Sequence, residues 1–394
     1  MSHISLPRPS QGRFWRLSHG RLRNGRSPGE SRQAARPALM AVGTAEVRRA
    51  AGAVAEWAAG GNSSGARRGL QIALGLTWLL DAALQYQPFM FGRGFVTQVL
   101  TPAQAGNPPL AARLPLDLGH LIIGDVAPWN AVFATVQLAL AVGLLWRPSA
   151  RAALAGTIVW SLSVWWLGEG LGGVLTGSAT PVSGAPGAAI LYAFLAVLIW
   201  PPRADHHPAR PGYQPARPGY HAHPSVADGS PLGGSLARSG WLVLWASAAY
   251  LAVQAPNRAP RALHDTIAGL VPGEPGWLAA LDRGVAAAAG SRGTAAAIVI
   301  AAVCAVIGLG ILVPGARRPA LALSMVLALA IWIAGENFGS IFTGQGTDPN
   351  TGPLLVLLAI AFWPRSPAVS PRKGDSRPLA GEERPLARGG GVRG

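Results

Sequence analysis

A short acidic element occurs twice in the chain, each time as Gly-Glu-x-x-Gly-x-x-x-Thr-Gly directly after an apolar block. Its candidate residues are Glu169, Gly172 and Thr176 in the first copy, and Glu336, Gly339 and Thr343 in the second. A carboxylate at the edge of a bilayer is costly unless it is paired, protonated or exposed to water. If the preceding helix continued through the element, the three side chains would share one face. We therefore predict ligand binding or proton relay at these residues. The structural alternative is a glutamate that caps a loop or pairs across the two copies.

Asp81 is the only acid inside the first apolar block, and it is a further candidate for ligand binding or proton relay. Ala248 stands at the equivalent position of the second half. If chemistry is present, the first half is therefore expected to hold the working site, while the second has drifted to a structural role. Asp348 and Asn350 are expected to cap the last helix, which is the common use of such residues in a turn-rich loop.

Other motifs that carry chemistry are absent from the sequence. We find no pattern for a phosphate-binding loop, a dinucleotide fold, a zinc site, haem attachment or a serine hydrolase. The single cysteine, Cys304, excludes an intrachain disulfide. The sequence therefore predicts no metal site and leaves open whether the chain is an enzyme.

The composition indicates a membrane protein. Hydrophobic residues make up 50% of the chain and charged residues 13%, about half of the charged fraction of a soluble domain. The net charge of +16 is concentrated in the tails and linkers, where arginines are retained on the cytoplasmic side and contact anionic lipid headgroups. This distribution favours the lipid bilayer, and not nucleic acid, as the partner. The single lysine, Lys373, is typical of a bacterial codon bias.

Eight apolar blocks predict eight transmembrane helices, at about 69–86, 129–146, 152–167, a fourth ending at 200–201, 241–253, 294–313, 320–334 and 353–363. The expected fold is all-α integral membrane, with two tandem parallel-oriented four-helix bundles. The expected divisions are a disordered basic tail 1–67, a four-helix unit 68–201, a Pro- and His-rich cytoplasmic linker 202–239, a second unit 240–364 and a disordered basic tail 365–394. The connection 92–128 is expected to lie along the membrane surface.

The two units are predicted to be copies of one another. Sliding the chain by 167 residues aligns Gly143–Thr180 with Gly310–Thr347, and fifteen of these thirty-eight positions are identical. Because each unit has an even number of spans, both insert in the same direction, as in a parallel repeat. The arginine-rich segments then predict a multi-pass protein of the cell membrane with both termini cytoplasmic. The two glutamates lie at the same depth on the extracytoplasmic side. Whether they face each other stays open.

The turn between the second and third spans resembles that of the DoxX-like family of four-helix membrane proteins. The matching residues are Gly143-Leu144-Leu145, Arg147, Arg151 and Ala152-Ala153, repeated as Gly310-Ile311-Leu312, Arg318 and Pro319-Ala320. The resemblance implies quinone-linked oxidation, or membership of a membrane redox complex in which partner subunits supply the redox centre. A small-solute transporter and a non-catalytic membrane assembly factor remain alternative functions.

Overall fold

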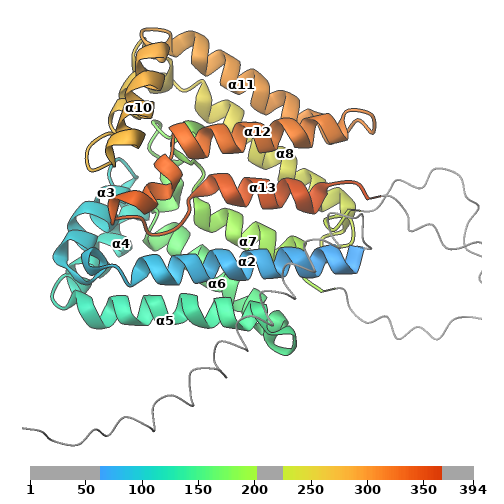
Figure 1. The fold of residues 1–394 in the computed structure, drawn as a ribbon, viewed down its shortest axis with the longest axis horizontal. Coiled ribbons are helices and arrows are strands. Elements are labelled where there is room, and N and C mark those ends of the chain that lie inside the picture. Colours follow the sequence, from blue (N-terminus) through green and yellow to red (C-terminus); the bar gives the residue numbers. More distant parts are fainter. Residues whose placement is uncertain (1–62, 202–224, 366–394) are drawn as a thin grey trace, which may run out of the picture. The chain divides into compact units, whose positions relative to one another are not determined.

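A computed structural model describes residues 63–201 and 225–365, which form helices and turns and no strand. Residues 1–62 and 366–394 of the predicted tails, and most of the predicted linker, lie outside these ranges. The prediction of a disordered tail up to residue 67 is wrong at its end, because α2 begins at Ser63 and the buried Arg67 donates hydrogen bonds to backbone carbonyls such as that of Trp200. Within the first half, four long helices follow one another: α2 (Ser63–Gln85), α5 (Val126–Leu145), α6 (Ala150–Leu167) and α7 (Ala188–Leu198). Each packs against the next, so that α2 lies on α5, α5 on α6 and α6 on α7 (Figure 1).

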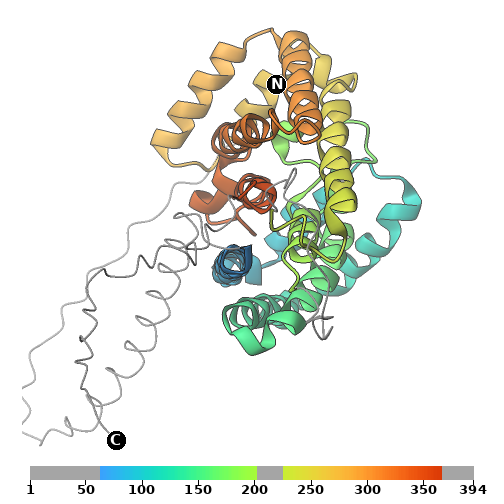
Figure 2. The same cartoon turned by 90° about the vertical axis from the view of Figure 1, so that its right-hand side faces the viewer.

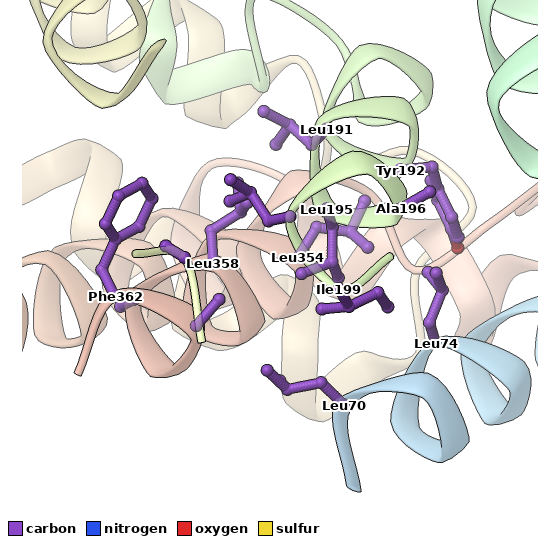
Figure 3. Packing of buried hydrophobic residues seen from close by; sticks show 14 of the residues in the cluster. Leu70, Leu74, Leu191, Tyr192, Leu195, Ala196, Ile199, Leu354, Leu358 and Phe362 are labelled. Atoms are coloured by element: carbon purple, nitrogen blue, oxygen red, sulfur yellow. The ribbon is translucent and has the colours of Figure 1, made fainter. Parts of the chain in front are cut away.

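The second half repeats this order with α8 (Gly233–Ala252), α11 (Gly293–Gly310), α12 (Arg317–Ala334) and α13 (Thr351–Phe362). The two halves meet where α7 packs against α13, which also contacts α2. Figure 2 shows α2 and α13 end-on, with α13 between α2 and the helices of the second half. Apolar side chains of α7, including Leu191 and Leu195, interdigitate there with Leu354, Leu358 and Phe362 of α13 (Figure 3).

The predicted apolar blocks therefore correspond to eight helices. The largest difference is at α8, which begins at Gly233 inside the segment predicted as linker. Ala237 in its second turn is fully buried, and Arg238 lies 3.5 Å from Asp228 in an ion pair. These contacts extend the helix beyond its apolar part, which is why hydropathy placed its start too late.

In residues 63–201 and 225–365, four helical segments are long and apolar enough to cross a membrane: Val126–Leu145, Arg147–Leu167, Gly293–Gly310 and Arg317–Thr343. Two further helices, α7 and α13, are apolar but have only 11 and 12 residues. These lengths and compositions are compatible with an integral membrane protein.

The surface of the long helices is apolar, while several of their polar side chains face inward. On α6, Val159 is 67% exposed, whereas Thr157 and Ser161 are buried. On α12, Val326 is 64% exposed, whereas Ser324 is buried. Helices with apolar outer faces are unusual in a protein surrounded by water, because large contiguous apolar surface is rare on soluble monomers. The pattern is that of helices whose outer faces contact lipid.

The two long connections between the first and second helices of each half contain short helices. The first holds the π-helical turn η2 (Phe95–Leu100), α3 (Thr101–Ala103) and α4 (Pro109–Ile122), and the second holds α9 (Ala262–Ala268) and α10 (Gly276–Ala289). In Figure 1, α3, α4 and α10 lie near the same end of the long helices. Leu110 of α4 is 92% exposed, which suits a segment lying along a membrane surface.

Corresponding helices of the two halves begin at the same 167-residue spacing found in the sequence. It separates the first residues of α4 and α10, of α5 and α11, and of α6 and α12. The turns follow the same rule, since Gly106 and Gly273 both have a positive φ just before the prolines that precede α4 and α10. Equivalent sequence positions thus adopt equivalent local structure.

Candidate functional site

The acidic element does not continue the helix that precedes it. The helix α6 ends at Leu167 and α12 ends at Ala334, and each is followed by a tight turn with positive φ angles. These turns are η4 (Gly170–Gly173) and η7 (Asn337–Thr343). The predicted sharing of one helical face by glutamate, glycine and threonine is therefore wrong, because the chain reverses direction between them.

Each glutamate instead caps the helix that follows. A carboxylate oxygen of Glu169 accepts a hydrogen bond from the backbone N–H of Ala189, at 3.0 Å, in the first turn of α7. The Glu336 carboxylate accepts from the backbone N–H of Gly352, at 3.0 Å, and from the hydroxyl and N–H of Thr351 at the start of α13. A carboxylate there also interacts favourably with the helix dipole. In both halves the glutamate thus caps backbone N–H groups, which is the structural alternative to a ligand-binding or proton-relay role.

The glycines and threonines of the element shape the turn. A Cβ on Gly172 would lie 1.9 Å from the carbonyl oxygen of Pro186, and one on Gly339 would lie 2.5 Å from that of Asp348. Both glycines have positive φ, which other residues adopt at a cost.

The threonine hydroxyls bond within the same turns, Thr176 to the carbonyl of Gly173 at 2.7 Å and Thr343 to that of Ser340 at 2.8 Å. Neither these threonines nor the two glycines line the cavity described next.

A cavity of about 350 Å³ lies in the first half, between α2, α5, α6 and α7 and under the first long connection. Its volume falls within the range of about 300–1,000 Å³ that is typical of small-molecule sites. Aromatic rings make up much of its wall: Trp78, Phe95, Trp129, Phe133, Trp160 and Tyr192. Its polar side chains include Asp81 and Glu169, two of the predicted candidates.

Several polar atoms in the walls of this cavity have no hydrogen-bond partner among the described residues. The Tyr192 hydroxyl donates to one oxygen of Asp81 at 2.7 Å, but the other oxygen of Asp81 is unpaired, although the residue is only 1% exposed. The side-chain oxygens of Gln85 and Gln137 and the indole N–H groups of Trp78 and Trp160 are also unpaired. Leaving one such group buried without a partner costs about 1–3 kcal/mol. Five such groups around one space would find hydrogen-bond partners in a bound polar ligand or in ordered water.

The electrostatics of the cavity are acidic. Its described lining residues contain three carboxyl groups, those of Asp81, Glu169 and Asp348, and no Arg, Lys or His. Loss of contact with water, reinforced by the nearby Asp348, raises the pKa of Glu169 to about 8. Burial also raises the pKa of Asp348, against the effect of its hydrogen bonds with Thr347 and the backbone of Asn350. Glu169 is therefore largely protonated at neutral pH.

The second half has no corresponding polar set. At the 167-residue spacing, Gln85, Gln137 and Trp160 are replaced by Ala252, Cys304 and Leu327, and Asp81 by Ala248. The Glu336 carboxylate accepts hydrogen bonds at the start of α13 and does not line the cavity. The expectation of a working site in the first half stays a prediction.

Sequence reasoning missed Tyr192, the two glutamines and the indole groups. The repeat carried part of the signal, since Gln85 and Gln137 lie in apolar blocks of the first half while Ala252 and Cys304 stand 167 positions later. Among the described residues, no group of three His, Cys, Asp or Glu side chains is arranged to hold a metal ion.

The described chain is thus an all-helical protein whose apolar helices are compatible with a membrane and whose first half contains a ligand-sized cavity. No protein-family model, curated protein or solved structure matches the chain. The DoxX-like resemblance of the helical turns therefore stays a prediction.

Proposed function

We propose that the chain is a multi-pass membrane protein made of two tandem four-helix units in the same orientation, with eight spans and both termini cytoplasmic. The common 167-residue spacing of helices and turns supports the tandem arrangement. The apolar outer faces of the helices support insertion into lipid.

The short helices α7 and α13 need a specific explanation in this proposal. Eleven residues of α7 span about 16 Å, roughly half of the hydrocarbon thickness. The non-helical turns before α7 and α13 would then lie at membrane depth. Irregular backbone is tolerated there only when protein satisfies its polar groups. The glutamate caps meet that need by accepting hydrogen bonds from the exposed N–H groups at the starts of both helices.

In this proposal the first unit binds the ring of a quinone-type lipid in its cavity and acts as a subunit of a membrane redox complex. The single observation that carries it is an aromatic cavity with unpaired donors and acceptors among its lining residues. A quinone supplies two-electron, two-proton chemistry when it is bound. The indole N–H groups of Trp78 and Trp160 would donate hydrogen bonds to ring oxygens. Asp81, positioned by Tyr192, would hold or accept a proton at its free oxygen.

Tryptophan fluorescence provides a direct test, because three tryptophans line the cavity. Titration of the purified protein with a short-chain quinone should quench this fluorescence with saturation. We expect Asp81→Asn and Glu169→Gln to weaken binding about 10-fold each, which corresponds to about 1.4 kcal/mol. Glu336→Gln is the matched control, because it alters the equivalent cap outside the cavity and should leave affinity unchanged.

Three results would count against the quinone proposal: no saturable quenching, equal effects of the two glutamate substitutions, or no quinone co-purifying with the protein. Solute counterflow in liposomes without quinone binding would favour a transporter instead. Loss of a neighbouring complex on deletion, with neither of these signals, would favour an assembly factor.

A further inference from the structure

The second half of the chain contributes to the cavity of the first half. Thr347 and Asp348 belong to the loop before α13, yet they line the cavity between α2, α5, α6 and α7. The Asp348 carboxylate is held in place by the Thr347 hydroxyl, at 2.8 Å, and by the backbone N–H of Asn350, at 2.7 Å. Both oxygens of this carboxylate are therefore held by its own loop, while the residue lines a cavity formed mainly by the first half.

A difference in loop length accompanies this placement. In the first half, the indole of Trp165 donates to the carbonyl of Pro186, 21 residues later. In the second half, Trp332 makes the equivalent bond to Pro349, 17 residues later. The second loop is therefore four residues shorter between these shared landmarks. Asp348 precedes Pro349, while Ala185 precedes Pro186, so the acid has no counterpart in the first loop.

The loop before α7 also contacts the second half of the chain at two further points. A Cβ on Gly335 would lie 2.1 Å from the carbonyl oxygen of Val182, so the first loop lies directly on the acidic element of the second half. The Asn257 side chain of the second half donates to the carbonyl of Ala179 in the first, at 2.8 Å. These contacts join the two halves of the chain, one at the end of α12 and one at the turn η6 (Pro256–Arg258).

Four titratable groups interact electrostatically with Asp348. They are Asp81 on α2, Tyr192 on α7, Glu169 after α6 and Glu336 after α12. All four are acids, and no basic side chain is among the described lining residues. The three carboxyl groups that line the cavity, those of Asp81, Glu169 and Asp348, share a poorly solvated space and cannot all ionise, so this set retains protons.

We propose that the ligand site is a composite of both halves, in which Asp348 sets how many protons the cavity holds and thereby couples ligand binding to proton uptake. The coupling follows from solvation. An uncharged ring that enters the cavity displaces water from the carboxyl groups and so favours their protonated forms. Ligand binding then takes up protons, and the affinity falls as the pH rises. The direction of this coupling rests on the proposed function, because it requires an uncharged ligand.

Quinone affinity measured from pH 6 to pH 9 by tryptophan quenching tests this coupling. The wild-type dissociation constant should increase with pH, by up to about 10-fold per unit for one proton taken up. In Asp348→Asn the dependence should be flatter, and binding at pH 9 should be at least about threefold tighter, because one carboxyl group fewer has to take up a proton when the uncharged ring enters the cavity. Proton uptake, followed with an indicator dye in weak buffer, should decrease in parallel.

The asparagine variant should fold, since its side-chain oxygen can still accept the hydrogen bond from the backbone of Asn350. Asp265→Asn, at a largely exposed carboxylate on α9, is the control and should keep the wild-type pH profile. An unchanged pH profile and unchanged proton uptake in Asp348→Asn would overturn the proposal.

A second measurement needs no ligand and separates this proposal from the quinone proposal. Infrared spectroscopy should follow the protonated carboxyl of Glu169, assigned by its loss in Glu169→Gln, with a midpoint near pH 8 in the wild type. Asp348→Asn should move this midpoint to lower pH. Absence of quinone binding with a shifted midpoint would refute the proposed function alone, whereas an unmoved midpoint would refute the composite site.

Discussion

The glutamate caps allow a quantitative prediction about stability. In Glu336→Ala, the hydroxyl of Thr351 and the backbone N–H of Gly352 both lose the oxygen to which they donate. The N–H of Thr351 keeps a second acceptor, the Asn350 side chain at 2.8 Å, so two buried donors are left without a partner. At about 1–3 kcal/mol for each donor, we expect a loss of about 2–6 kcal/mol in the free energy of unfolding.

Glu336→Gln separates the cap from its charge. The amide oxygen can keep one of the accepted hydrogen bonds, while the interaction with the helix dipole is lost, so we expect a smaller loss of about 1–2 kcal/mol. Reversible denaturation in mixed micelles, followed by far-ultraviolet circular dichroism, measures both changes. If the alanine variant lies within roughly 0.5 kcal/mol of the wild type, which is the range of neutral surface substitutions, then the capping argument is wrong.

Three further predictions follow from the same contacts. Gly172→Ala should lower stability by about 1–3 kcal/mol, because its Cβ would overlap the Pro186 carbonyl at a positive φ; thermal unfolding equal to wild type would contradict this. Tyr192→Phe should weaken quinone binding severalfold with little change in melting temperature, since the Asp81 carboxylate loses the hydroxyl that orients it; an unchanged dissociation constant would remove Tyr192 from the site. A periplasmic alkaline phosphatase reporter fused after Gly394 should be inactive, and an active fusion would reverse the proposed orientation.

The helices were largely predictable because apolar blocks and helices coincide when the outer faces of a protein are apolar. The first and last residues of a helix were less predictable where a polar contact determines how far the helix extends. Arg238 and its ion pair with Asp228 extend α8 into a segment that has the composition of a linker. The spans predicted at 152–167 and 320–334 end where α6 and α12 end, but the sequence did not predict the positive φ angles of Leu171 and Gly172 in the turn that follows α6.

The candidate site was predictable only in part, for a physical reason. Asp81 and Glu169 stood out because a carboxyl group in or beside an apolar block is costly wherever it lies. Gln85, Gln137 and Tyr192 carry no such penalty individually, and only the packing of α2, α5 and α7 brings them to one space. The proposed role of Asp348 depends on the course of the loop before α13, which brings this residue to a cavity of the first half. A local sequence pattern does not predict the course of such a loop.

The contacts between the two halves also have a consequence for the proposed arrangement of two units in a single chain. Had the ancestral protein been a symmetric pair of identical subunits, every change in one cavity would also have occurred in the other. Covalent fusion removes that constraint, because each copy can then mutate independently. The first half can then keep Gln85, Gln137 and Tyr192 in the cavity. The second half can replace its equivalents by residues that only pack, and can contribute Asp348 to the cavity of the first half. Separated halves, on this view, would lack parts that only the partner half now encodes.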